Sequence, residues 1–177
     1  MDEAREDERQ ELEMACARVS RQKFTPPWRT DRLFRNLFAD MTGNTHRTEF
    51  CIDKLYAPES SSGRLGLVEY RAFEMPPHHR MAATQALLMR ACIAAFWNTP
   101  YERRLVRWGT RLHDDFMLPH FVEQDFRDAI AELRSYGAPL EAAWFGPHFA
   151  FRLPLLATVS ELGMTLQLRQ APVPWNT

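Results

Sequence analysis

The hydrophobic pattern of the chain changes at residues 42–44 (TGN), from the spacing of about 3.6 residues typical of helices to a spacing of two. Residues 45–56 and 65–74 alternate apolar and polar side chains, and the turn-forming sequence APESSSG lies between them. This pattern is typical of an antiparallel β-hairpin that has one apolar and one polar face. The sequence therefore predicts a sheet at this point, with helices before and after it.

Strand alternation divides the side chains of this hairpin between its two faces. A register that buries Phe50 against Val68 or Tyr70 turns Glu49 and Arg71 to the opposite face, because side chains repeat every two residues along a strand. Neighbours across two strands lie about 5 Å apart, so a carboxylate and a guanidinium on that face can pair. The odd positions carry Arg47, Glu49, Cys51, Asp53, Leu67, Glu69, Arg71 and Phe73; the even positions carry Phe50, Ile52, Val68, Tyr70 and Ala72, with Lys54 as the exception.

Four helical segments are expected around the hairpin. Residues 2–21 form a charged amphipathic helix, and Thr30 is placed to cap a second helix after the paired prolines. Residues 80–98 are apolar on most sides, so we expect this helix to pack deep against the sheet. Residues 121–135 form an amphipathic helix that Gly137 closes.

Two later segments also predict strands. In residues 149–153 (FAFRL) the alternation leaves Arg152 opposite the aromatic side chains, and in residues 164–170 (MTLQLRQ) it leaves Arg169 opposite the leucines. Residues 103–120 (RRLVRWGTRLHDDFMLPH) are expected to hold a short extended piece and then a helical turn. If all four strands join one sheet, its charged face holds Arg47, Arg71, Arg152 and Arg169 with Glu49, Asp53 and Glu69, and its apolar face packs on the helices.

The expected organisation is one α+β domain over residues 1–177, with a helical segment over 1–41 and the sheet and remaining helices over 42–177.

The composition of the chain excludes several classes of protein. A net charge of −1 gives no basic surface for nucleic acid or an anionic membrane. The three cysteines lack the CxxC spacing of a zinc site, and no segment reaches the roughly 20 apolar residues that span a bilayer. A cytoplasmic protein without nucleic-acid or membrane partners is expected.

The charged face of the hairpin has two interpretations. It is either the solvated side of an ordinary antiparallel sheet or the wall of a binding site. Arginine suits phosphate or carboxylate ligands, and clustered carboxylates suit a hard cation such as magnesium. The residues alone leave both interpretations open.

Other candidate sites have less support in the sequence. Cys51 and His46 could act as a nucleophile and base, but their opposite parity points them apart. The tryptophans at 97, 108 and 144 are expected to anchor the core. No phosphate-binding GxGxxG or GxxxxGK sequence occurs. A zinc site remains open for His78, His113, His120 and His148.

Long segments of the chain resemble a bacterial family of proposed amidoligases. They are PWRTDRLFRNLFADMTGNTHRTEFCIDKLYAPESSSGRLGLVEYRAFEMPPHHRM, VRWGTRLHDDFMLPHFVEQDF, WFGPHFAFRLP and LQLRQAPVPW. The resemblance covers nearly the whole chain and places it in the superfamily of glutamine synthetase and glutamate–cysteine ligase. It implies a curved antiparallel sheet, a partial barrel packed on one side by helices, whose inner face holds ATP, magnesium and substrate. It also implies a transglutaminase-like domain in the same polypeptide.

The resemblance suggests roles for individual residues. The Glu-x-Arg element of the superfamily matches Glu69-x-Arg71, in which the glutamate would bind magnesium and the arginine would contact the transferring phosphate. Glu49 and His46 would be further metal ligands, and strand parity favours Glu49. Arg71 and Glu49 are the candidate catalytic residues, and the candidate nucleotide-binding residues are Arg47, Arg71, Arg152 and Arg169.

The resemblance implies ATP-dependent joining of a small-molecule or peptide carboxylate to an amine. The chain begins where the middle of the family module is expected and stops where relatives continue, which suggests a C-terminal part with half a site and no turnover of its own. Two alternatives stay open: a non-catalytic docking or substrate-binding module that serves the transglutaminase-like domain, and a metal-dependent hydrolase.

Overall fold

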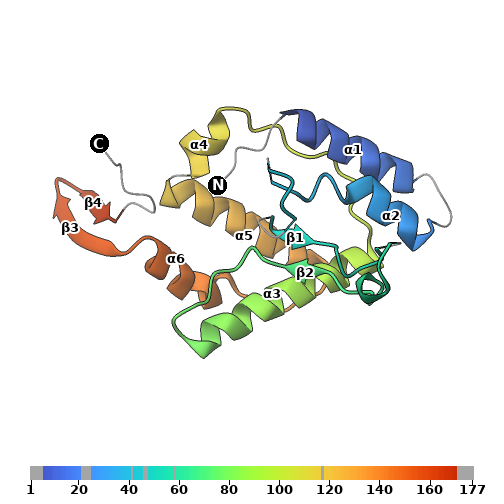
Figure 1. Ribbon diagram of the computed structural model, residues 1–177. Helices are drawn as coiled ribbons and strands as arrows, with labels where there is room; N and C mark the ends of the chain where they lie inside the picture. Colours follow the sequence, from blue (N-terminus) through green and yellow to red (C-terminus); the bar gives the residue numbers. More distant parts are fainter. Residues whose placement is uncertain are drawn as a thin grey trace. The chain divides into compact units, whose positions relative to one another are not determined.

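The computed structural model shows a mixed α and β fold, as the sequence predicts (Figure 1). It describes residues 6–20, 25–40, 42–45, 48–57, 59–116 and 118–170. The chain divides into two compact units. The N-terminal unit comprises residues 1–74 and 103–107, and the C-terminal unit comprises residues 75–102 and 108–177.

Two helices begin the N-terminal unit, α1 (Glu6–Ser20) and α2 (Pro27–Phe34). Helix α2 starts at the paired prolines, because the first helical position needs no backbone N–H and proline already has a helical φ. Pro26 is the residue that precedes the first turn, and it makes no side-chain capping bond. The predicted cap at Thr30 is therefore wrong, since Thr30 lies inside the helix.

The hairpin of the N-terminal unit has the predicted parity but shorter strands, β1 (Phe50–Cys51) and β2 (Glu69–Tyr70). Phe50 pairs with Tyr70 and Cys51 with Glu69 in antiparallel register. The rings of Phe50 and Tyr70 meet edge to face with centroids 5.4 Å apart, and the ring of Phe38 lies 5.9 Å from that of Phe50. The strands are short because the chain turns directly after β1, where Leu55 N–H donates to the carbonyl of Ile52 at 2.9 Å.

The core of the C-terminal unit is formed by helices. The long helix α3 (His79–Asn98) packs on α5 (Pro119–Ser135) and on the 3₁₀ turn η2 (Ala142–Phe145). Its apolar residues Leu87, Ile93 and Phe96 are exposed. The expectation that this helix packs deep against a sheet is therefore wrong, because its buried side faces other helices. The buried residues of the core are Ala95, Ile130, Leu133, Leu140 and Phe145.

A strand was predicted at residues 149–153, but the structure has helix α6 (Gly146–Arg152) there. Phe145 and Phe149 are four residues apart and both contact Phe126, with ring centroids at 4.9 and 5.5 Å. Four residues rise only about 6 Å along a helix but about 13 Å along a strand, so a helix brings both rings close enough to contact one aromatic side chain. Arg152 therefore ends a helix, and it does not lie on a strand face. The predicted helical turn is found as α4 (Arg111–Phe116).

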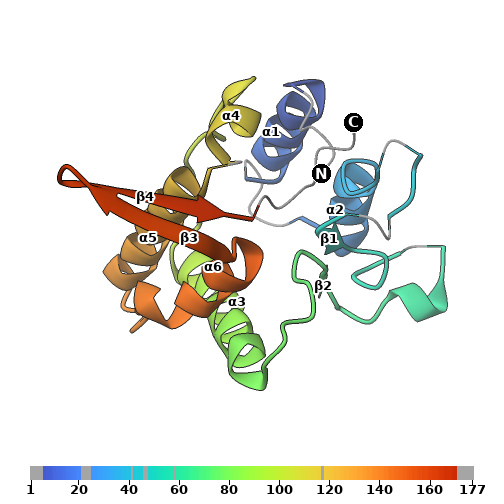
Figure 2. The same ribbon diagram turned by 90° about the vertical axis from the view of Figure 1, so that its left-hand side faces the viewer.

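A second hairpin ends the described chain, with β3 (Leu155–Glu161) and β4 (Met164–Arg169) (Figure 2). It forms a two-stranded sheet separate from that of β1 and β2, so the four described strands do not join one sheet. The turn places Leu162 and Gly163 at φ of 52° and 75°, as in a type I′ turn. Its large apolar side chains Leu155, Leu156, Val159, Met164, Leu166 and Leu168 are all exposed. Among the helices of the described residues, none combines the length and apolar character that crossing a membrane requires.

Candidate functional site

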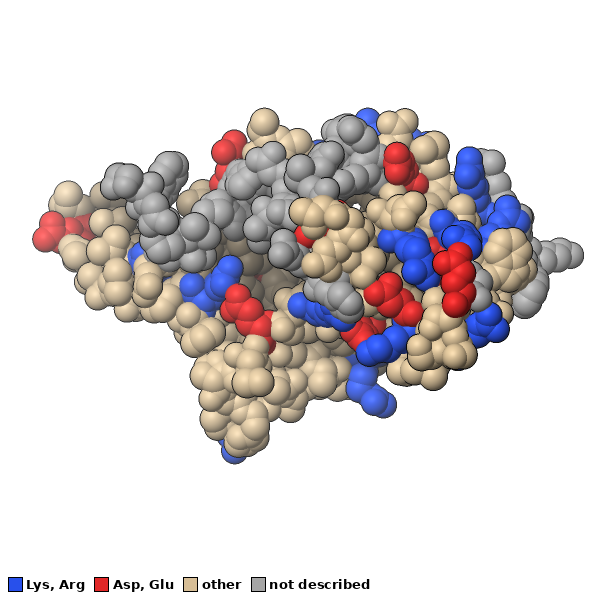
Figure 3. Space-filling view, in the orientation of Figure 1, with Lys and Arg blue, Asp and Glu red and all other residues tan. Residues whose placement is uncertain are grey.

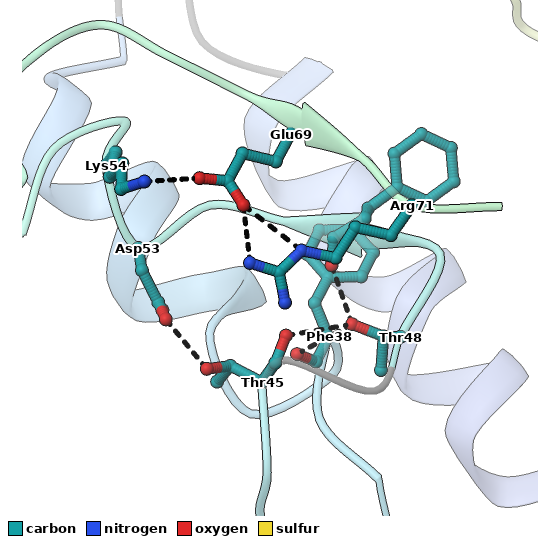
Figure 4. Close-up of polar contacts among 8 residues, drawn as sticks. Phe38, Thr45, Thr48, Asp53, Lys54, Glu69 and Arg71 are labelled. Carbon is teal, nitrogen blue, oxygen red and sulfur yellow. Dashed lines mark hydrogen bonds and ion pairs between the residues drawn. The ribbon is translucent and has the colours of Figure 1, made fainter. Parts of the chain in front are cut away.

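Glu69 lies between two cations on the charged face of the first hairpin (Figure 4). Its Oε1 accepts a hydrogen bond from Lys54 Nζ at 2.6 Å. Its Oε2 accepts from Arg71 Nε at 3.1 Å and also from Arg71 Nη2. Strand parity predicted that Glu69 and Arg71 share this face, and the structure brings them together.

The backbone fixes both cations of this cluster relative to each other. The carbonyl of Lys54 accepts hydrogen bonds from Leu65 N–H and Leu67 N–H, each at 3.1 Å. On the other strand, Arg71 N–H donates to the carbonyl of Glu49 at 2.8 Å. The two side chains therefore approach Glu69 from backbone segments that are anchored across the hairpin.

The electrostatic consequence appears mainly at Glu69. The hydrogen bond from Lys54, followed by that from Arg71, lowers the pKa of Glu69 to about 2. The same contacts raise the pKa of Lys54 and of Arg71. The cluster thus holds two positive charges and one negative charge at neutral pH. It stays accessible, because the exposed side-chain fractions are 53% for Lys54, 29% for Glu69 and 26% for Arg71.

Two threonines organise the backbone and the carboxylate beside this cluster (Figure 4). Thr45 Oγ1 donates to Asp53 Oδ2 at 2.7 Å, so this carboxylate has a hydroxyl partner. Thr48 Oγ1 donates to the carbonyl of Phe50 at 2.7 Å, which supports the start of β1.

More ion pairs surround this part of the N-terminal unit. Asp31 is fully buried and accepts from Arg35 through both carboxylate oxygens, with Nη2–Oδ1 at 2.6 Å and Nε–Oδ2 at 3.1 Å. Arg32 pairs with Glu59, joining α2 to the loop between the strands. Figure 3 shows acidic and basic side chains interleaved over this region. The buried Asp31 is a feature that the sequence did not indicate, because an Asp and an Arg four residues apart usually lie on a solvated helix face.

The remaining predicted residues are Glu49, His46, Arg47, Arg152 and Arg169. The side chain of Glu49 is exposed, although its backbone pairs with Arg71. His46 and Arg47 lie outside the described residues. Arg152 and Arg169 belong to the C-terminal unit, where Arg169 Nη1 donates to the carbonyl of Leu153 at 2.9 Å. These five positions stay predictions.

A magnesium site is not formed by the side chains that the structure describes. Within those residues, no group of three or more His, Cys, Asp and Glu side chains lies close enough to hold a metal ion. Both oxygens of Glu69 already accept hydrogen bonds from cations, so a metal ion bound there would lie beside two positive charges. The described residues therefore do not fit a bound magnesium ion in this arrangement.

The weaker candidates are also resolved in part. His78 caps α3, with its Nδ1 accepting from Arg80 N–H at 3.2 Å. Both ring nitrogens of His148 are buried and have no hydrogen-bond partner among the residues that the structure describes. Cys51 is buried, which argues against its use as a nucleophile. Trp97 is 85% exposed and Trp144 is 44% exposed, so their predicted place in the core is wrong.

Lys54 is the residue of this cluster that sequence analysis did not propose. It is the one charged residue at an even position of the first predicted strand, residues 45–56, and parity alone would turn it away from Glu69. Lys54 escapes that parity because it lies in the turn at residues 53–55 and not in a strand. The sequence did hold one signal for this contact: a single lysine that interrupts the alternation of apolar and polar residues at the end of a predicted strand.

Comparison with known proteins agrees with the resemblance seen in the sequence. No curated protein and no solved structure matches the chain. One family model matches it over residues 1–177, that of the family described as "Putative amidoligase enzyme (DUF2126)". Since this match covers the whole chain, the protein belongs to the amidoligase family DUF2126.

Proposed function

We propose that this chain is part of an ATP-dependent ligase that joins a carboxylate to an amine. The observation that carries the proposal is the Glu69–Arg71 pair, which the superfamily's Glu-x-Arg element implies and which lies on an accessible face of the first hairpin. Membership of an amidoligase family supports the reaction class. The curved antiparallel sheet of that superfamily belongs to the same proposal, with β1 and β2 as two of its strands.

The proposed reaction has two steps. A substrate carboxylate oxygen attacks the γ-phosphorus of ATP, the bond from that phosphorus to the β–γ bridging oxygen breaks, and ADP leaves. The amine nitrogen then attacks the carbonyl carbon of the acyl phosphate, a C–N bond forms, and phosphate departs as the nitrogen loses a proton. Negative charge on the phosphate oxygens must be stabilised throughout, which is the usual task of arginine in such sites.

Arg71 is the residue that we place on the transferring phosphate, and Glu49 lies on the opposite strand directly beside it. Arg47, Arg152 and Arg169 remain proposed nucleotide contacts. Magnesium bound by Glu69, Glu49 and His46 remains a prediction from the family resemblance. The described residues do not form that donor set.

The test is a phosphate-release assay on the full-length protein with MgATP and a panel of carboxylates and amines. Arg71→Met is expected to abolish amine-dependent phosphate release, whereas Arg71→Lys retains the charge but loses the bidentate fork. Arg127→Met is the matched control, because Arg127 is an exposed arginine in a single 3.5 Å ion pair with Glu123. Phosphate release that Arg71→Met leaves unchanged would contradict the role of Arg71. A wild-type protein without activity across the panel would favour the second candidate.

The second candidate is a docking module for the transglutaminase-like domain of the same polypeptide. The observation that favours it is the hairpin of β3 and β4, whose leucine, valine and methionine side chains are all exposed. An isolated two-stranded hairpin is marginally stable in water, and contiguous exposed apolar surface marks interaction sites. Hydrogen exchange on the full-length protein tests the idea. Docking predicts slow exchange for Val159 and Leu166, and Leu166→Ser should remove that protection.

A further inference from the structure

We infer that Lys54 and Arg71 form a binding site for an oxyanion, a phosphate or a carboxylate, and that Glu69 occupies this site as an internal competitor. This inference rests on the proposed function for the source of the ligand, but it makes a separate statement about binding. It adds Lys54 to the site. It also assigns Glu69 to compete with the ligand for the two cations, which is a different role from binding a metal ion.

The geometry of the cluster supports an anion site. Lys54 Nζ and the guanidinium of Arg71 contact different oxygens of one carboxylate, at 2.6 Å for Lys54 Nζ and 3.1 Å for Arg71 Nε. The two cations come from separate segments of the hairpin, and backbone hydrogen bonds to Lys54 O and Glu49 O anchor those segments. Two fixed cations that converge on one pair of oxygens present the same donors to any oxyanion of similar size.

Glu69 can leave this position without disturbing the backbone. Its main chain pairs with Cys51 in the strand register, so only its side chain has to rotate. All three side chains are partly exposed, and ion pairs at such exposure are weak because water competes for both charges. A ligand from solvent can therefore reach Lys54 and Arg71 and exchange with the carboxylate.

The neighbouring carboxylates do not fill the same position. Asp53 accepts a hydrogen bond from Thr45 Oγ1 at 2.7 Å, and Glu49 faces Arg71 through its backbone carbonyl. Glu69 is the one carboxylate, among the described residues, that contacts both Lys54 and Arg71. Removing its charge should therefore strengthen oxyanion binding.

Binding of inorganic phosphate to the full-length protein in EDTA tests the inference, by calorimetry or NMR titration without ATP. Glu69→Gln should tighten phosphate binding about fivefold or more, because it removes a competing anion and leaves both cations in place. Lys54→Met and Arg71→Met should each weaken binding about tenfold, the usual order for one charge-assisted contact. In the Glu69→Gln background, Lys54→Met should cancel the gain.

The matched control is Glu141→Gln, which removes a carboxylate from another exposed ion pair, with Arg134 at 2.6 Å. It should leave phosphate binding unchanged. A second titration with acetate separates the two sources of oxyanion. A gain for phosphate alone assigns the site to the phosphoryl group, and a gain for acetate alone assigns it to the substrate carboxylate; equal gains define a general oxyanion site.

A Glu69→Gln protein that keeps its NMR spectrum and binds both anions no more tightly than wild type would overturn the inference. Unchanged phosphate binding in Lys54→Met would also overturn it. Lys54 is exposed, so this variant should keep its fold and gives a test that does not depend on Glu69→Gln. Ligase activity without any gain in Glu69→Gln would refute this inference alone. A gain in binding without ligase activity on any substrate would refute the proposed function alone.

Discussion

Replacing Asp31 by Asn tests how strongly a buried charge holds the N-terminal unit together. Asp31 is fully buried in α2, and both of its oxygens accept hydrogen bonds from Arg35. Asparagine keeps the shape of the side chain but removes the charge, and it puts an NH₂ group where an acceptor was needed. The variant therefore weakens the pair and buries donors without a partner.

The magnitude follows from the exposure of the two partners. Breaking a fully buried pair costs about 3–5 kcal/mol, and exposed pairs contribute about 0–1 kcal/mol. Asp31 has no exposed surface, but the side chain of Arg35 is 34% exposed, and Asp53 and Glu59 also act on its charge. Arg35 thus keeps water and other carboxylates as partners. We expect Asp31→Asn to lower the free energy of unfolding by about 2 kcal/mol, between those two limits.

Urea unfolding measures this loss through NMR signals of the unit that carries each substitution, the N-terminal unit for Asp31 and the C-terminal unit for the control. The control is Asp115→Asn, which removes a carboxylate from the pair of Arg111 and Asp115, also four residues apart on a helix. The side chain of Arg111 is 70% exposed, so this variant should cost less than about 0.5 kcal/mol. A loss for Asp31→Asn that is no larger than for the control would refute the argument from burial.

Leu140→Ala should cost about 3 kcal/mol in the C-terminal unit, because Leu140 is 1% exposed and its removal leaves a cavity, and the urea midpoint measures this. Gly63→Ala should cost about 1–3 kcal/mol by the same assay, since an added Cβ would lie 2.5 Å from Ala57 Cβ. Leu162→Asn should raise the melting temperature, because asparagine tolerates the φ of 52° better than leucine. The pKa of Glu69 is lowered from 4.5 to about 2, so its pairs stabilise the fold above pH 4.5 and lose that effect as the pH falls toward 2; Glu69→Gln should reduce the slope of stability over this range.

Sequence alone predicted the two faces of the first hairpin because a strand repeats every two residues. That rule is local, and it placed Phe50 opposite Val68 or Tyr70 and put Glu69 and Arg71 on one face. The expected burial of the apolar face is wrong, because Phe50 and Tyr70 are 42% and 40% exposed. The rule could not give the length of the strands. The turn after β1 depends on hydrogen bonds between Lys54 and residues 65 and 67, which are remote in the sequence. The same turn brings Lys54 to Glu69, so the pattern missed this contact for a physical reason.

Residues 149–153 show where local pattern reading fails. FAFRL alternates as a strand would, but Phe149 also lies four residues after Phe145, and both rings contact Phe126. Contact of both rings with Phe126 on α5 needs the short rise of a helix, and tertiary packing of this kind overrides local preference. Helix α3 shows the related limit. Its apolar pattern predicted the helix correctly, but it could not say that α5 and η2 would cover it in place of a sheet.

The two hairpins place different physical demands on the rest of the protein. In the first hairpin, Glu69 forms ion pairs with Lys54 and Arg71, so these charges are stable in water when no ligand is bound. The hairpin of β3 and β4 differs, because it exposes large apolar side chains to water. Exposed apolar surface is unfavourable in free energy. A docking partner that buried this apolar surface would lower the free energy of the protein, whether or not the first hairpin takes part in catalysis. The ligase and docking proposals therefore rest on different elements, and a failure of one leaves the evidence for the other intact.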